Sequence, residues 1–175
     1  MTTIVDRRAM IIERLVTLFT GFTVQLIGDP VLSPGVSITA GNVVHNRDQL
    51  PAEKVPGIIL LDADETKDPR VFERPPGRAL PVSPCLMRMT PEIYVVLDVR
   101  TPNNANVGED LNTARAALLD LVLHDATLLQ IVGANGQIIY GGCVTDLARN
   151  RTMRGQMGIL VTFVYPFIPN ALTPQ

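Results

Sequence analysis

GEDLNTARAALLDLVLHDATLLQIV, residues 108–132, carries apolar side chains at helical spacing and ends next to Gly133, a common helix terminator. Two acidic residues lie in its first turn, where negative charge favours the helix dipole. Asp125 is a candidate N-cap for a short continuation, so we expect a kink near His124. The segment therefore predicts one long helix that breaks near its C-terminal end.

A β-hairpin is predicted directly after this helix. An Asn-Gly turn at Asn135–Gly136 leads into the strand QIIYGGCVTDL (137–147), and the strand GILVTFVYPF (158–167) follows. Both faces of the second strand are apolar, so we expect one to cover a helix and the other to be free for a second subunit. The glycines Gly141 and Gly142 inside the first strand indicate a bulge or a close backbone approach.

The rest of the chain adds one helix and several strands. Residues 4–20 have one apolar face and a charged back, which predicts an amphipathic helix that stops at Gly21. In residues 92–100, alternation predicts a half-buried strand whose more polar face points outward. The other predicted strands are 36–40, 57–62 and 86–90. Strands outnumber helices and mostly neighbour each other in sequence, so we predict an α+β fold in which an antiparallel β-sheet packs against two main helices.

Length and one irregular segment bear on domain organisation. At 175 residues the chain is long enough for a hydrophobic core and favours a single domain, residues 1–175, with a C-terminal tail at 168–175. Residues 63–83 are dense in charge and proline and lack a helix or strand signal. Loops of about 20 residues inside a compact domain are usually functional arms or disordered segments, so this segment is predicted to be a long extended loop rather than a linker.

Composition narrows the classes of function. A net charge of −2 at pH 7 argues against a general nucleic-acid binder, because phosphate contacts need a positive excess. The 13 arginines outnumber the 2 lysines, a bias that favours interfaces but that a GC-rich genome also produces. Neither a signal peptide nor an apolar run of about 18 residues is present, so we expect a soluble, cytoplasmic chain. Cys85 and Cys143 are expected to be reduced, buried or half-buried thiols.

The densest acidic cluster, DADETKD at residues 62–68, follows a predicted buried strand. Its spacing loosely resembles a calcium loop, but Lys67 stands where that loop needs glycine and Pro69 interrupts the turn. We therefore interpret the cluster as a solvated loop and keep a divalent-metal site as the alternative. His45 and His124 have no nucleophile motif beside them, and no phosphate-binding or dinucleotide-binding motif occurs. No catalytic, cofactor-binding or metal-binding residue is predicted.

A second charged segment, ARNRTMRGQ at residues 148–156, carries Arg149, Arg151 and Arg154 and no acidic residue. At the tip of the predicted hairpin these side chains would form a compact positive patch. The segment is either a solvated loop or a contact site for an acidic partner surface or for DNA that passes nearby.

Several short motifs follow the N-terminal amphipathic helix in a fixed order. They are N-R-x-x-L-P at 46–51, P-x-I-x-L-x-D-x-D-E at 56–65, V-G-E-x-L at 107–111, G-x-I-x-Y at 136–140 and F-V-Y at 163–165. In this layout the chain resembles, over roughly residues 40–167, the tail terminator (minor tail, tail-completion) proteins of long-tailed bacteriophages. The resemblance implies α+β subunits that assemble into a ring, typically a hexamer, which stops polymerisation of the tail tube and presents a face for the head connector. It implies neither a cofactor nor catalysis.

A ring subunit needs two lateral surfaces and a means of reaching its neighbour. We expect residues 63–83 to be an arm that docks in a groove of the neighbour, and the loop 148–156 to contact the tail tube or face the DNA channel. The candidate arm residues are Arg70, Phe72, Arg74, Arg78 and Leu80, and the candidate loop residues are Arg149, Arg151 and Arg154.

The sequence therefore predicts a structural virion protein of a phage tail or neck, assembled in the host cytoplasm, with neither enzymatic activity nor a membrane partner. Its expected partners are further copies of itself, the tail tube protein and the head–tail connector or neck protein, with DNA close by in the channel. A head–tail connector, another tail-completion component and a subunit of a phage-derived particle remain alternatives. An alternative of a different class is a divalent-metal-dependent α+β enzyme that uses the carboxylates between Asp62 and Asp68.

Overall fold

The computed structural model describes residues 6–24, 36–37, 42–46, 49–70, 85–98, 107–147 and 154–167. Within these ranges the helices are α1 (Arg7–Thr20), α2 (Val107–Leu123), α3 (Ala126–Val132) and a short 3-10 helix, η2 (Ala52–Lys54). The main sheet contains β3 (Val43–His45), β4 (Gly57–Leu61), β5 (Glu65–Lys67), β6 (Cys85–Met89), β7 (Glu92–Asp98), β8 (Gln137–Leu147) and β9 (Arg154–Phe167). A separate antiparallel pair joins β1 (Thr23–Val24) to β2 (Val36–Ser37).

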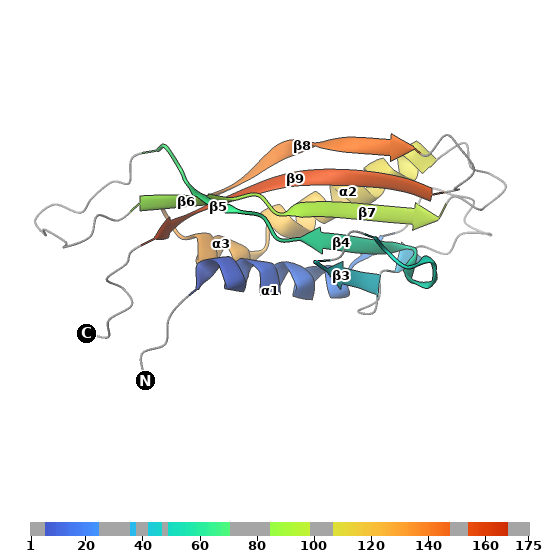
Figure 1. The fold of residues 1–175 in the computed structure, drawn as a ribbon, viewed down its shortest axis with the longest axis horizontal. Helices are drawn as coiled ribbons and strands as arrows, with labels where there is room; N and C mark the ends of the chain where they lie inside the picture. The colour runs from blue at the N-terminus through green and yellow to red at the C-terminus, as the bar shows by residue number, and fades with distance from the viewer. Residues whose placement is uncertain are drawn as a thin grey trace, which may run out of the picture.

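The main sheet is organised around the long strand β9. β7 and β6 pair with successive parts of β9, and β4 and β5 pair with β7 and β6 in turn. β8 pairs with the other side of β9 and forms one edge, while β3 and β5 lie on the opposite side (Figure 1). Among the described strands of this sheet every pair is antiparallel except β3–β4, which is parallel. The predicted α+β fold is therefore confirmed, with one parallel pair added.

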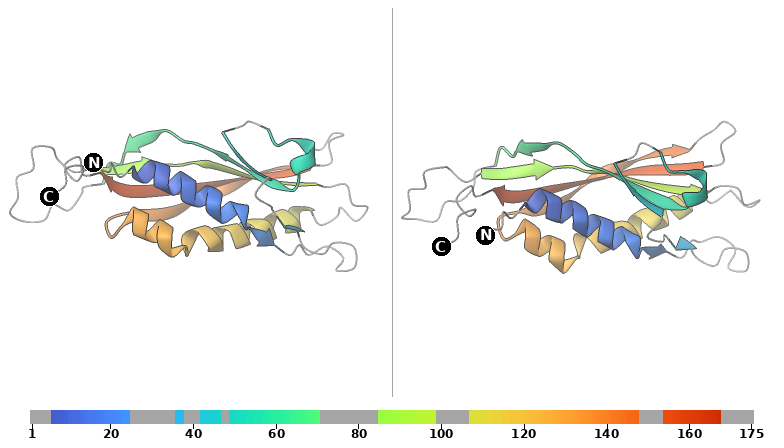
Figure 2. Two further views of the ribbon diagram at one scale, coloured as in Figure 1. Left: turned by 90° about the horizontal axis from the view of Figure 1, so that it is seen from below. Right: turned by 60° about the horizontal axis from the view of Figure 1, so that its bottom comes forward.

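All three α-helices lie on one face of the sheet (Figure 2). In α1 the side chain of Asp6 accepts a hydrogen bond from the backbone of Ala9, and the helix gives way at Gly21, as predicted. Its buried residues share one stripe and are Ile11, Ile12, Leu15 and Phe19. These side chains and the inward side chains of α2, α3, β4, β7 and β9 form the main core.

The predicted break in the second helix is also confirmed. α2 ends at Leu123, and α3 starts after Asp125, whose carboxylate accepts a hydrogen bond from the backbone N–H of Leu128 at 2.8 Å. The same carboxylate binds Arg14 of α1 through two hydrogen bonds of 3.1 and 2.7 Å, and the Arg14 guanidinium lowers the pKa of Asp125. One residue thus starts α3 and fixes it to α1.

The hairpin of β8 and β9 agrees with the prediction in its first strand and differs in its second. The register shifts between Tyr140 and Gly142, and Gly142 has a φ of 119°, so the glycine pair forms a bulge. β9 begins at Arg154 rather than at residue 158, so the predicted loop 148–156 is shorter than expected. The reason is pairing on both sides, since Gln156 has partners in β7 and in β8.

A second correction concerns the predicted loop 63–83. Its residues Glu65–Lys67 form β5 and pair with β6. All three side chains are exposed, so the segment has no apolar alternation to reveal a strand. Hydrogen bonding to β6, which no local pattern encodes, makes these residues a strand.

A smaller core lies on the other face of the sheet, away from the α-helices. The side chains of Val44, Leu50, Ile59 and Val96 are buried together there. Val96 therefore departs from the expectation that this face of β7 is polar and points outward. Leu50 and the half-buried Val55, which lie in the connection between β3 and β4, pack in this cluster.

Candidate functional site

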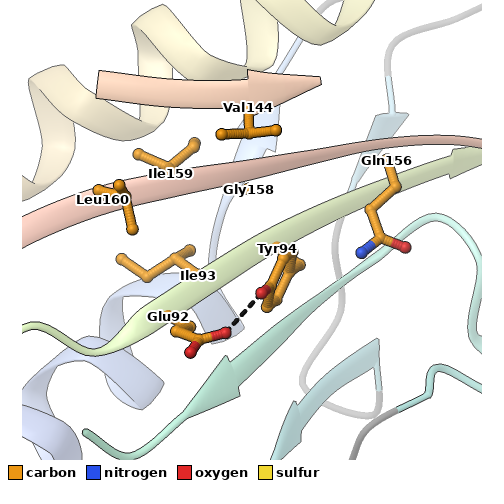
Figure 3. Close-up of a pocket in the computed structure, with 8 residues that line it drawn as sticks. All are labelled: Glu92, Ile93, Tyr94, Val144, Gln156, Gly158, Ile159 and Leu160. Atoms are coloured by element: carbon orange, nitrogen blue, oxygen red, sulfur yellow. Dashed lines mark hydrogen bonds between the residues drawn. The ribbon is translucent and has the colours of Figure 1, made fainter. Parts of the chain in front are cut away.

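The face of β7, β9 and β8 that lies opposite the α-helices, here called the open face, carries a groove of about 330 Å³ (Figure 3). Three adjacent strands supply its walls, and the lining is mostly apolar. The lining residues are Glu92, Ile93, Tyr94, Val144, Gln156, Gly158, Ile159 and Leu160.

Two neighbouring rows of the sheet each lack one side chain on this face, and this produces the hollow. In the first row Gly158 of β9 lies between Val144 of β8 and Tyr94 of β7. A Cβ on Gly158 would lie 3.0 Å from Cε1 of Tyr94, so the tyrosine ring stands close beside a bare backbone. In the second row Leu160 lies between Glu92 and the bulge residue Gly142. The floor of the groove is therefore the backbone at Gly158, beside the β8 bulge at Gly142.

Three large apolar side chains on the open face are exposed. Val144 is 69% exposed, Leu160 39% and Ile139, which lies opposite Thr162, 38%. Exposed apolar side chains that adjoin a groove are typical of a binding surface, whereas single ones elsewhere carry no such meaning. The open face thus has the character of a docking surface.

Two of the polar lining residues, Glu92 and Tyr94, come from β7 and are hydrogen-bonded to each other (Figure 3). The Tyr94 hydroxyl donates a hydrogen bond to the Glu92 carboxylate, and that bond together with burial raises the pKa of Tyr94. Glu92 is exposed, and a carboxylate can accept further hydrogen bonds besides the one from Tyr94, for example from a positively charged partner. The groove therefore offers apolar walls with a carboxylate at its rim.

A cluster of charged residues at one end of the same face fixes the chain where it leaves β5. Asp68 is only 1% exposed, and its backbone N–H donates to the carbonyl of Leu86, which continues the β5–β6 ladder. Its carboxylate accepts hydrogen bonds from Arg70 Nε at 2.8 Å and from Arg88 Nε at 3.0 Å. Arg70 also donates to the side chain of Gln137 in β8. The Arg70 guanidinium, with help from Arg88, lowers the pKa of Asp68 to about 2.

The acidic cluster 62–68 does not come together as one site. Asp62 binds His45 Nε2 at 2.6 Å, and although burial alone raises the pKa of Asp62, its hydrogen bonds to His45 and Asn46 outweigh that effect and lower it. Glu65 accepts a hydrogen bond from the Tyr165 hydroxyl, and Asp68 is held by its two arginines. In the described part of the chain no group of three metal-ligating side chains converges. This arrangement does not favour the divalent-metal alternative.

The other predicted site residues fall in different places. Arg70 is held within the chain by Asp68 and Gln137. Arg154 belongs to β9, where its backbone pairs with Asp98, but its side chain is outside the described residues. The remaining candidates also lie outside the described residues, and they are Phe72, Arg74, Arg78, Leu80, Arg149 and Arg151.

The groove itself was only partly predictable from the sequence. The second apolar face of the last strand, which includes Leu160, signalled a free surface. The juxtaposition of Tyr94, Gly158 and Val144 gave no such signal, because it depends on the register of three strands that are far apart in the chain.

No protein-family model matches the chain, and no curated protein shows significant sequence similarity to it. Among the described residues, no helix is both long and apolar enough to cross a membrane.

Proposed function

We propose that this protein is a structural assembly subunit that acts as a phage tail terminator. In this function a ring of its copies caps the tail tube, ends tube polymerisation and presents the docking face for the head or neck connector. The observation that carries the proposal is the exposed apolar groove on a sheet whose other face is packed against helices. The order of short sequence motifs between residues 46 and 165 supports the choice of family.

The geometry of the groove favours docking over chemistry. Its floor is backbone, its walls are Val144 and Leu160, and its only carboxylate among the lining residues is Glu92, already bonded to Tyr94. A general base needs a pKa near the working pH and a position within hydrogen-bond reach of the proton that it removes. The groove instead offers a shaped, mostly apolar surface. A second protein surface is the ligand that such a groove fits best.

The rest of the described structure supports a rigid subunit. β9 is paired along both sides over most of its length, and Arg14 with Asp125 fixes the helix layer. A ring closes when the same head-to-tail contact is repeated by a constant rotation until the last copy meets the first. A rigid subunit keeps that rotation constant, and the rotation sets the number of copies in the ring. We propose the tail tube protein and the connector as the partners on the two ring faces, with Arg149, Arg151 and Arg154 toward the tube or the DNA channel.

The test is the mass of the purified chain by light scattering over a concentration series, alone and with tail tube protein. A ring-sized species in either condition is the expected result. A monomer that persists at all concentrations and has no affinity for tube protein would overturn the proposal. Binding to connector protein without binding to tube protein would instead identify a head–tail connector.

A further inference from the structure

We propose that the groove on the open face receives residues 71–84 of a second copy of this chain. The inference rests on the proposed ring, for which it supplies the contact between neighbours. It is drawn from the place where the chain leaves the sheet, the length of the segment, and the match of its residues to the groove.

The last described residues before the segment place their side chains on the same face of the sheet as the groove. In the β5–β6 ladder Asp68 follows on the side of the sheet that carries Arg88, and Arg88 lies opposite Val164, an open-face residue of β9. Arg70 then crosses the end of β9 on that face to reach Gln137 in β8. The Asp68 cluster therefore holds the chain, up to Arg70, at the end of the face that carries the groove.

The segment is too short to place its anchors in the groove of its own copy. The groove begins at Leu160, about 23 Å along β9 from Phe167, which pairs with Cys85 where the segment ends. Leu80 precedes Cys85 by five residues, which span at most about 18 Å. Phe72 follows Arg70 by two residues, or about 7 Å, and Arg70 lies at the same far end of the sheet. A groove that accepts these anchors must belong to another molecule.

The residues of the segment complement those of the groove. VFERPPGRALPVSP combines the apolar Phe72 and Leu80 with two arginines and one glutamate, and the groove combines apolar walls with the carboxylate of Glu92. Arginine at the rim of an aromatic, glycine-floored groove forms a charge-assisted hydrogen bond without burying an unpaired charge. The four prolines of the segment restrict its backbone and so reduce the entropy lost on binding.

Such a contact joins two different surfaces, a segment of one copy and the groove of the next. It is therefore heterologous. After one contact has formed, one copy still has a free groove and the other still has a free segment, so the contact can be repeated. Repetition of this contact from copy to copy gives a closed ring or an open fibre.

The contact is tested first with a synthetic peptide of residues 71–84 and the purified full-length chain, by fluorescence anisotropy of a labelled peptide. We expect saturable binding that weakens at least about tenfold in Val144→Glu. Leu129→Glu is the matched control, since Leu129 is 49% exposed on α3, away from the groove, and should leave binding unchanged. Absence of saturable binding, or equal binding by Val144→Glu, would overturn the inference.

A mixing experiment tests the contact in the full chain. Phe72→Glu disables the segment as a ligand and leaves the groove intact. Val144→Glu disables the groove and leaves the segment intact, so each variant alone should stay monomeric. Mixed, they should form a heterodimer that does not grow, because only one pairing remains. Rings formed by Phe72→Glu alone would contradict the inference while leaving the ring proposal intact. Peptide binding by a chain that never forms rings would contradict the ring proposal and leave the contact standing.

Discussion

The two faces of β9 show how one strand can separate folding from docking. Toward the helices the strand presents Ile159 and Phe163, both fully buried in the main core. Toward the open face it presents Gly158, which has no side chain, and Leu160, which is 39% exposed. Because side chains alternate along a strand, these two sets are neighbours in sequence but meet different surroundings. Changes at the helix-covered positions should therefore affect stability, and changes at the exposed positions of the open face should affect assembly.

The largest expected effect comes from the buried face. Phe163→Ala removes a fully buried ring from the main core, so we expect a loss of about 3–5 kcal/mol in the free energy of unfolding. Urea denaturation followed by circular dichroism measures it. A loss below 1 kcal/mol would show that the helix-covered face is not the stabilising one.

The charged cluster at the end of the open face should give an intermediate effect. Asp68→Asn removes the carboxylate that holds Arg70 and Arg88, and because both arginines are partly exposed we expect a loss of roughly 1–2 kcal/mol at pH 7. The pKa of Asp68 is about 2 in the folded chain against 3.8 as the reference value, so its stabilisation is present above pH 4 and disappears as the pH falls toward 2. Urea midpoints of the chain and the variant should therefore converge on acidification, and a difference that stays constant with pH would contradict this origin.

The smallest effect on stability is expected from the open face itself. Leu160→Ala shortens an exposed side chain on the same strand as Phe163, so it should change the free energy of unfolding by at most about 1 kcal/mol. The same urea titration measures both variants. A loss of unfolding free energy equal to that of Phe163→Ala would mean that the exposed position contributes as much to stability as the buried one.

Local signals in the sequence predicted the parts of the fold that local physics determines. Asp125 is a candidate cap from the sequence because a carboxylate at that position satisfies a free helix N–H. The Gly141–Gly142 pair indicates a bulge or a close backbone approach, and the structure has the bulge, with a positive φ at Gly142 that glycine tolerates. The strand Glu65–Lys67 was not predicted, because its three exposed side chains show no apolar alternation. Its strand structure depends on pairing with β6.

The candidate site was less accessible to prediction. That the last strand has a second apolar face was visible, but the groove needs Tyr94, Val144 and Gly158 in one row, and only the register of β7, β9 and β8 creates that row. The segment 71–84 and the loop that carries Arg149 and Arg151 lie outside the described residues, so their predicted roles stay predictions.

The most direct test of the open face as the assembly surface is sedimentation velocity of three proteins under one condition, each with tail tube protein present: the chain itself, Val144→Glu and Leu129→Glu. Both variants place a charge at an exposed apolar position, one on the open face and one on the helix side. We expect the unaltered chain and Leu129→Glu to sediment as rings, and Val144→Glu to remain a folded monomer. Rings of undiminished mass in Val144→Glu would contradict the proposal that copies of this protein meet at the open face.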